Sequence, residues 1–265
     1  MTTLTQAQEQ VIKRMEFAGY TWGIKHTPEP AGPGPNHFSH EPTEVWVDDD
    51  GFLHLRLHER DGRWLSSEII SDWPVGYGTY EFRLAPGTEH LDPNAVLGLF
   101  TWDHHTWATD ANSEIDIELT RWAEADAPNL HYSVHPTRGV EGQRHRERYR
   151  AETIDLQGEG STHVIRWTPD RITCSSYIGD QGPDADRLIA AWSYDASNPP
   201  RTTGNPAGEV TGPITIPRPS PTTSVRINLW LLNADRQGLG DPPTDGQPVE
   251  VILTGFSYTP FDEAD

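Results

Sequence analysis

The feature that most constrains the fold is the alternation of apolar and polar residues in short segments along most of the chain. In residues 52–58 (FLHLRLH) three leucines alternate with polar residues, and residues 78–84 (GTYEFRL) alternate in the same way. Successive side chains of a β-strand point to opposite faces, so a period of two predicts strands with one buried face. By the same reasoning we expect further strands at residues 96–102, 114–120, 129–135, 163–168, 171–177, 187–193, 224–232 and 248–258. Many short strands separated by Gly, Pro and Asp are typical of a β-sandwich or barrel.

The length and the loops indicate a single domain covering residues 1–265. All-β domains of this size often stand alone. Residues 195–222 are rich in Pro, Gly, Ser and Thr, and too few strands follow them to build a second domain, so we interpret them as a long surface loop. Residues 1–40 are expected to form an N-terminal arm. Within it, residues 1–20 predict a short helix or an ordered arm, and residues 27–36 (TPEPAGPGPN) predict a loop.

Composition excludes some classes of function. The net charge of −20 would repel phosphate backbones, which argues against binding to nucleic acid. No apolar run approaches the roughly 20 residues that cross a bilayer. Cys174 is the only cysteine, so no intrachain disulfide can form, and we expect it to be a small core residue. The first residues carry no basic segment followed by an apolar one, so we expect a cytoplasmic chain or one whose leader was removed. We expect a monomer.

The most informative motif is the acidic triplet Glu114-Ile-Asp116-Ile-Glu118. On a strand the three carboxylates share one face, while the intervening isoleucines pack on the core. Carboxylates two residues apart have backbones roughly 6.6 Å apart, and two unit charges at that distance repel by about 2.5 kcal/mol at an effective dielectric constant of about 20. This repulsion is sufficient to raise the pKa of one carboxyl group. A carboxylic acid beside an ionised carboxylate is the pair that glycosidases use.

The same motif imposes a geometric condition. Glu114 and Glu118 have backbones roughly 13 Å apart on a straight strand, whereas a retaining glycosidase needs carboxyl groups about 5–5.5 Å apart. Catalysis therefore predicts a curved sheet with the triplet in its hollow. The alternative is a solvated acidic strand in a very acidic protein.

Around this triplet the chain resembles glycoside hydrolase family 16. The E-x-D-x-E motif is unbulged, as in the lichenase-like branch. Four further segments are similar to family motifs and occur in the family's order: GYGTYEFR (76–83), LGLFTW (97–102), HVIRWTPDRI (163–172) and NLW (228–230). His163 stands at a position usually held by Tyr. The resemblance implies an all-β fold, an antiparallel two-sheet jelly roll of the concanavalin A-like type, with a concave substrate groove.

The resemblance also implies roles for individual residues. Glu114 would be the nucleophile and Glu118 the acid/base, with Asp116 tuning both by charge and hydrogen bonding. Sugar faces pack on aromatic planes, and ring hydroxyls exchange hydrogen bonds with carboxylates and amides. The expected substrate-binding residues are Glu81, Trp102, Trp107, Tyr132, His135, Asn228 and Trp230. Trp230 could equally be a core residue, and Asn228 is expected to face a cleft because a buried amide needs partners.

Cofactor and metal expectations are limited. The implied reaction requires no cofactor, and family members often carry a structural calcium, whose ligands the sequence does not identify here. The neighbouring His104 and His105 are interpreted as loop residues. His131 and His135 would share a strand face.

The sequence is compatible with three functions. The first is a retaining, endo-acting β-glycoside hydrolase that cleaves a β-glucan-like polysaccharide by double displacement. The second is a non-catalytic carbohydrate-binding protein on the same fold, which the changed residues flanking the triplet would suit. The third is an intracellular biosynthetic enzyme that uses the fold on another small substrate. The presence of both Glu114 and Glu118 favours the first, with a poly- or oligosaccharide as partner.

Overall fold

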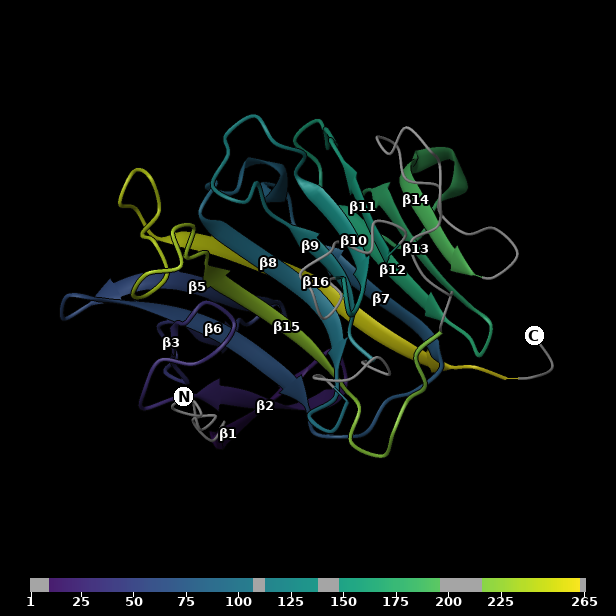
Figure 1. The fold of residues 1–265 in the computed structure, drawn as a ribbon, viewed down its shortest axis with the longest axis horizontal. Coiled ribbons are helices and arrows are strands. Elements are labelled where there is room, and N and C mark those ends of the chain that lie inside the picture. The colour runs from purple at the N-terminus through teal and green to yellow at the C-terminus, as the bar shows by residue number, and fades with distance from the viewer. Residues whose placement is uncertain (1–9, 107–112, 138–147, 196–215, 263–265) are drawn as a thin grey trace.

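The computed structural model describes residues 10–106, 113–137, 148–195 and 216–262, which form a two-layered all-β fold (Figure 1). The strands are β1 (Gln10–Phe17), β2 (Tyr20–His26), β3 (His37–Phe38), β4 (Val45–Val47), β5 (Leu53–Arg60), β6 (Arg63–Ser71), β7 (Gly78–Leu84), β8 (Ala95–Trp102), β9 (Ile115–Leu119), β10 (Leu130–Val134), β11 (Tyr149–Glu152), β12 (Ser161–Trp167), β13 (Arg171–Ile178), β14 (Leu188–Asp195), β15 (Ser224–Leu231) and β16 (Val249–Pro260). The predicted antiparallel sandwich is confirmed. The described residues contain no helix long and apolar enough to span a membrane.

The two layers are joined through one hairpin. The first layer, called the site sheet below, has the strand order β11-β10-β9-β8-β15-β6-β2-β1. The second sheet has the order β5-β16-β7-β12-β13-β14, with β4 at the free edge of β5. Strand β6 pairs with β5 near its start and with β15 farther along, so the chain passes from one layer to the other there. β15 and β16, which follow the predicted loop 195–222, each pair within one of these sheets, while residues 196–215 lie outside the described part of the chain.

The core lies between the sheets. Leu99 and Ile117 from the site sheet and Phe82 from the second sheet are fully buried there. Cys174 is also fully buried, as the sequence predicts. The strict alternation of β7, with Tyr80, Phe82 and Leu84 inside, explains why its bounds coincide with the predicted segment.

Of the two alternatives for residues 1–20, a short helix or an ordered arm, the helix is wrong where the structure describes the chain. Residues 10–17 form strand β1, which pairs with β2. Ala18 and Gly19 connect the two strands and both have positive φ, which matches the twist of a two-residue hairpin. Phe17 is buried against Trp22 of β2, with ring centroids 6.4 Å apart. Cross-strand pairing and burial of Phe17 outweigh the helical spacing of a few apolar residues.

Candidate active site

Strand β9 positions the acidic triplet. Ile115, Ile117 and Leu119 point into the core and are essentially inaccessible. The carboxylates of Asp116 and Glu118, and of Glu114 just before the strand, therefore point to the opposite face of the site sheet, called the site face below. The side chains of Glu114 and Asp116 are 17% and 7% exposed, so these charges are partly desolvated.

Strand β10 fixes two of these carboxylates. Ser133 pairs with Asp116 in the register of the strands, and its hydroxyl donates to Asp116 Oδ2 at 2.5 Å. His135 lies between two carboxylates, with Nε2 3.2 Å from Asp116 Oδ2 and Nδ1 3.6 Å from Glu114 Oε2. Its backbone N–H also donates to the Glu114 carbonyl. The arrangement holds Glu114 and Asp116 in place from one side.

The electrostatics separate the roles of the ionisable groups. Burial alone would lower the pKa of His135, but the carboxylates of Glu114 and Asp116 outweigh it and raise the pKa to about 10. Burial raises the pKa of Glu118 to about 8, with a further contribution from the Asp116 carboxylate, while His135 acts in the opposite direction. At neutral pH the site therefore presents a protonated acid, Glu118, beside a partly buried imidazolium–carboxylate pair.

Asn228 lies across β8 from Glu118. Gly98 pairs with Glu118 on one side and with Asn228 on the other. A Cβ atom at position 98 would lie 2.5 Å from Asn228 Oδ1, so only glycine leaves room for the amide over this strand. Asn228 Oδ1 is buried and has no hydrogen-bond partner among the described residues. It is therefore an acceptor that a ligand hydroxyl could satisfy.

Three charged residues on the site face were not identified from the sequence. Glu68 of β6 is flanked by Lys25 of β2 and Arg226 of β15, and all three side chains are at most 5% exposed. Arg226 alternates with Asn228 and Trp230 on β15, so strand alternation alone could have placed Arg226 on the site face. Lys25 and Glu68 are 43 residues apart, and no local pattern predicts that pairing.

Two of the predicted aromatic binding residues, Trp102 and Trp230, both lie on the site face. Trp230 packs with Phe38 and Val96 in a small cluster separate from the main core, with Trp122 against it at a ring distance of 6.5 Å. Trp102 ends β8 two residues after Phe100, which pairs with Asp116, so it shares the site face. It is half-buried, with the Arg226 guanidinium 5.8 Å from the centre of its ring.

Two predicted binding residues lie elsewhere. Tyr132 points into the core between His131 and Ser133, and its hydroxyl donates to Ser176. Glu81 lies on β7 of the second sheet, where it forms an ion pair with Arg83. Strand alternation excludes Tyr132 from the site face, and the motif that contains Glu81 identifies a strand without indicating its sheet. Trp107 lies outside the described residues.

Three residues of the site carry groups that can ligate a metal ion. Glu114, Asp116 and His135 offer ligand atoms within 4.8 Å of one another. An imidazole must lose its second proton to bind a metal, however, and the high pKa of His135 opposes this loss. The imidazolium itself supplies the positive charge between the two carboxylates.

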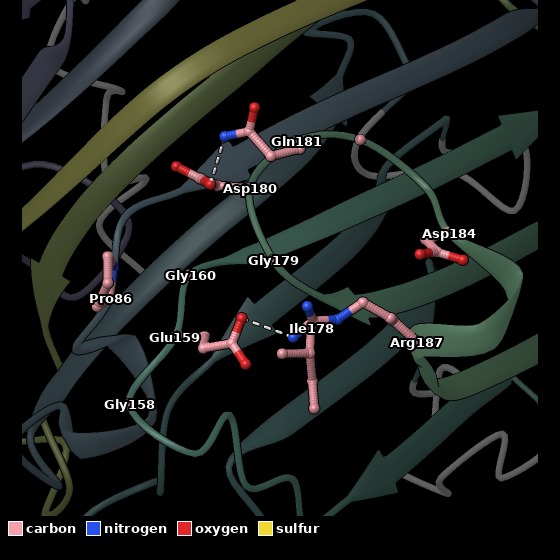
Figure 2. A pocket seen from close by; sticks show the side chains of 11 residues that line it. Pro86, Gly158, Glu159, Gly160, Ile178, Gly179, Asp180, Gln181, Asp184 and Arg187 are labelled. Carbon is pink, nitrogen blue, oxygen red and sulfur yellow. Dashed lines mark hydrogen bonds and ion pairs between the residues drawn. The ribbon is translucent and has the colours of Figure 1, made fainter.

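A surface pocket lies between the segment before β12 and the turn after β13 (Figure 2). It is formed by residues 158–160 and by the turn that follows β13, with Arg187 bound to Glu159 at 2.6 Å across it. Its acidic side chains belong to exposed turns, and none of the triplet residues lines it. We therefore place the candidate chemistry on the site face of β9.

The comparisons with known proteins concern the fold. No model of a known protein family and no curated protein matches the chain. A β-glucanase of Bacillus licheniformis superimposes with a TM-score of 0.59 at 17% identity, over 97% of this chain and 99% of that one. The fold is that of the jelly-roll glucanases. A β-1,3-1,4-glucanase (lichenase) derived from a mouse hindgut metagenome gives 0.57 at 17% identity, over 91% and 93% of the two chains. An immunostimulatory antigen and pseudo β-1,3-glucanase of Mycobacterium tuberculosis gives 0.60 at 17% identity, over 91% of each chain.

Proposed function

We propose that the protein is a retaining β-glycoside hydrolase that acts on a β-glucan-like saccharide. The observation that carries this proposal is the pKa of about 8 for Glu118 on the same strand face as Glu114. One group can then donate a proton at neutral pH while the other attacks. The glucanase fold supports the choice of substrate class.

The proposed reaction has two displacements. The Glu114 carboxylate attacks the anomeric carbon, the glycosidic C–O bond breaks, and Glu118 gives its proton to the leaving oxygen. The Glu118 carboxylate then removes a proton from water, and the water oxygen displaces Glu114. The sugar is released with its original anomeric configuration. The reaction uses side chains of this chain and requires no cofactor.

Asp116 and His135 have positioning roles in this scheme. Asp116 accepts from Ser133 and contacts His135, which also contacts Glu114. The chain of contacts restrains the nucleophile, and the charge on Asp116 helps to keep Glu118 protonated. Restraint of the attacking oxygen supports the rate because reacting groups must be held in a near-attack geometry.

A second candidate is carbohydrate binding without hydrolysis. One structural neighbour is called a pseudo β-1,3-glucanase. In that case Glu114 and Glu118 would bind sugar hydroxyls and no bond would break. An intracellular enzyme acting on a small substrate is a third alternative, and no feature of the site favours it over the first.

A reducing-sugar assay tests the proposal. The panel contains mixed-linkage β-glucan, laminarin, xyloglucan, agarose and carrageenan, and compares wild type with a Glu114→Gln/Glu118→Gln variant. Glu81→Gln serves as a control because Glu81 lies on the second sheet. We expect the wild type and the control to hydrolyse one of the glucans and the double variant to be inactive. Binding of a glucan by the folded wild type without any release of reducing sugar would instead establish the second candidate.

A further inference from the structure

Glu68 faces the same side of the sheet as the triplet, but both of its carboxylate oxygens are already bonded within the described part of the chain. Glu68 Oε1 accepts from Arg226 Nη1 at 3.0 Å, and Oε2 accepts from Lys25 Nζ at 2.9 Å. Asn228 Nδ2 lies 3.4 Å from Oε2. The carboxylate is 1% exposed and its oxygens are all bonded within the protein. It therefore neutralises its cationic neighbours and is not available to bind hydroxyls.

The two cations also fasten loops over these strands. Lys25 Nζ donates to the carbonyl of Gly32 at 2.8 Å, and its ammonium lies 4.0 Å from the centre of the Phe38 ring. Arg226 Nη2 lies 3.0 Å from Nε2 of His104, in the segment that follows β8. The segments 27–36 and 103–106 thus contact the face of β2, β6 and β15 directly.

The loop over β2 and β6 is itself fixed. Ala31 and Asn36 exchange two backbone hydrogen bonds, which makes residues 32–35 the tip of a small hairpin. The Asn36 amide donates to the Leu231 carbonyl at 2.9 Å and accepts from the Ser66 hydroxyl at 3.0 Å. Gly240 N donates to the Pro35 carbonyl, so the loop that contains Gly240 also holds the loop 27–36 in place. Because the oxygen and the nitrogen of the buried Asn36 amide are both hydrogen-bonded, the loop 27–36 is fixed to the strands below it.

The other side of the triplet is more open. The side chain of His135 on the β10 side is 33% exposed, and Trp122 is half-buried. Asn228 lies between the covered part of the site face, on β15, β6 and β2, and the more open part around the triplet. Its Oδ1, which has no hydrogen-bond partner among the described residues, lies over Gly98 next to Glu118.

We propose that the closed half of the site face, defined by Lys25, Glu68 and Arg226, stops the saccharide at Asn228. The enzyme would then act on the end of a β-glucan chain or on a short β-glucan oligosaccharide. The inference rests on the proposed function and replaces the endo-acting mode expected from the sequence. An extended chain would need to cross β15, β6 and β2, where the described polar groups of the network are already bonded and the two loops lie.

Two measurements on the intact protein test the inference. Calorimetric titration of the Glu114→Gln variant with β-glucan oligosaccharides of increasing length measures how many sugars the site holds. We expect the affinity to stop rising at short lengths, with less than about twofold change thereafter. For the wild type, we expect reducing ends to appear while polymer viscosity stays constant, and one product size to dominate from the start. Affinity that rises through the longest oligosaccharides, or an early fall in viscosity, would contradict the proposal of a closed end without contradicting the proposed hydrolase activity.

A loop variant provides the complementary test. Replacement of Gly32–Pro35 by Asn-Gly shortens the connection between Ala31 and Asn36 from four residues to two and removes the carbonyls that Lys25 and Gly240 contact. We expect this variant to bind longer oligosaccharides more tightly than the wild type. Asp61→Asn creates the same Asn-Gly turn between β5 and β6 and should change nothing.

The outcomes separate the two proposals. If affinity stops rising at short oligosaccharides but the wild type hydrolyses none of them, the proposal of a closed end is supported and the proposal of a hydrolase is contradicted. An absence of both binding and hydrolysis would remove both. If the loop variant does not fold, the wild-type product pattern and the Glu114→Gln titration still decide the question.

Discussion

At the scale of single residues, the site depends on His135 between two carboxylates. Its contacts with Asp116 and Glu114 order the acidic side chains, and its charge offsets part of their repulsion. Glu118 lacks this direct contact among the pairs described and is raised in pKa by burial and by Asp116. The different surroundings of similar carboxyl groups separate a proton donor from its neighbours.

The first prediction concerns pH. Glu118 must be protonated to act as the acid, so kcat/KM should fall as the pH rises through about 8. Asp116→Asn removes a charge that raises the pKa of Glu118, so this basic limb should move to lower pH. His135→Gln removes a charge that lowers that pKa, so the limb should move to higher pH. Profiles of kcat/KM against pH for both variants measure the shifts. If the basic limb moves in the same direction in the two variants, the assignment of Glu118 as the acid is contradicted.

The sequence contained the triplet and its common face, because strand alternation is a local property. It also indicated that Asn228 faces a cleft, since an amide in an apolar strand needs partners. It did not indicate the Lys25–Glu68–Arg226 network, because the contacts join three strands distant in the chain. The raised pKa of Glu118 follows from burial, which depends on how those strands assemble.

At the scale of elements, β10 decides which side chains reach the site. Its residues alternate, with Ser133 beside Asp116 and Tyr132 in the core. Its register against β9 brings Ser133 opposite Asp116, which a shift of one residue would replace by a core side chain. The sequence predicted a strand here. The choice of Tyr132 as a binding residue did not take into account that neighbouring residues of a strand, such as Tyr132 and Ser133, point to opposite faces.

The second prediction compares these two neighbours. Tyr132→Phe removes a buried hydroxyl that donates to Ser176 and should reduce the free energy of unfolding by about 1 kcal/mol. Its kcat and KM should not change. Ser133→Ala removes the hydroxyl that holds Asp116 and should lower kcat. Denaturant unfolding and steady-state kinetics on both variants separate the effects, and a lower kcat for Tyr132→Phe would place that residue in the site after all.

At the scale of the whole molecule, the sandwich joins one mainly structural sheet to one that carries the chemistry. Sequence periodicity predicted the all-β architecture because each strand buries one face. The family resemblance placed Glu81 in the binding site, but the motif that contains Glu81 identifies a strand without indicating its sheet. Periodicity also missed β1, whose pairing with β2 is a tertiary contact.

The third prediction concerns the net charge of −20. Self-repulsion of so many carboxylates opposes the compact state, and salt screens it. The Debye length falls from about 10 Å at 0.1 M to about 3 Å at 1 M salt. The melting temperature should therefore rise with sodium chloride concentration over this range. Scanning calorimetry measures it, and a melting temperature that falls with salt would show that ion pairs outweigh the self-repulsion.

Azide rescue is the most direct test of the division of roles between Glu114 and Glu118. With an activated aryl β-glucoside, Glu118→Ala should still form the glycosyl-enzyme, and azide should then give the β-glycosyl azide. Glu114→Ala lacks the nucleophile, so azide should attack directly and give the α-glycosyl azide. Proton NMR distinguishes the two anomers. We expect opposite anomers from the two variants; the same anomer from both, or the reverse assignment, would contradict these roles.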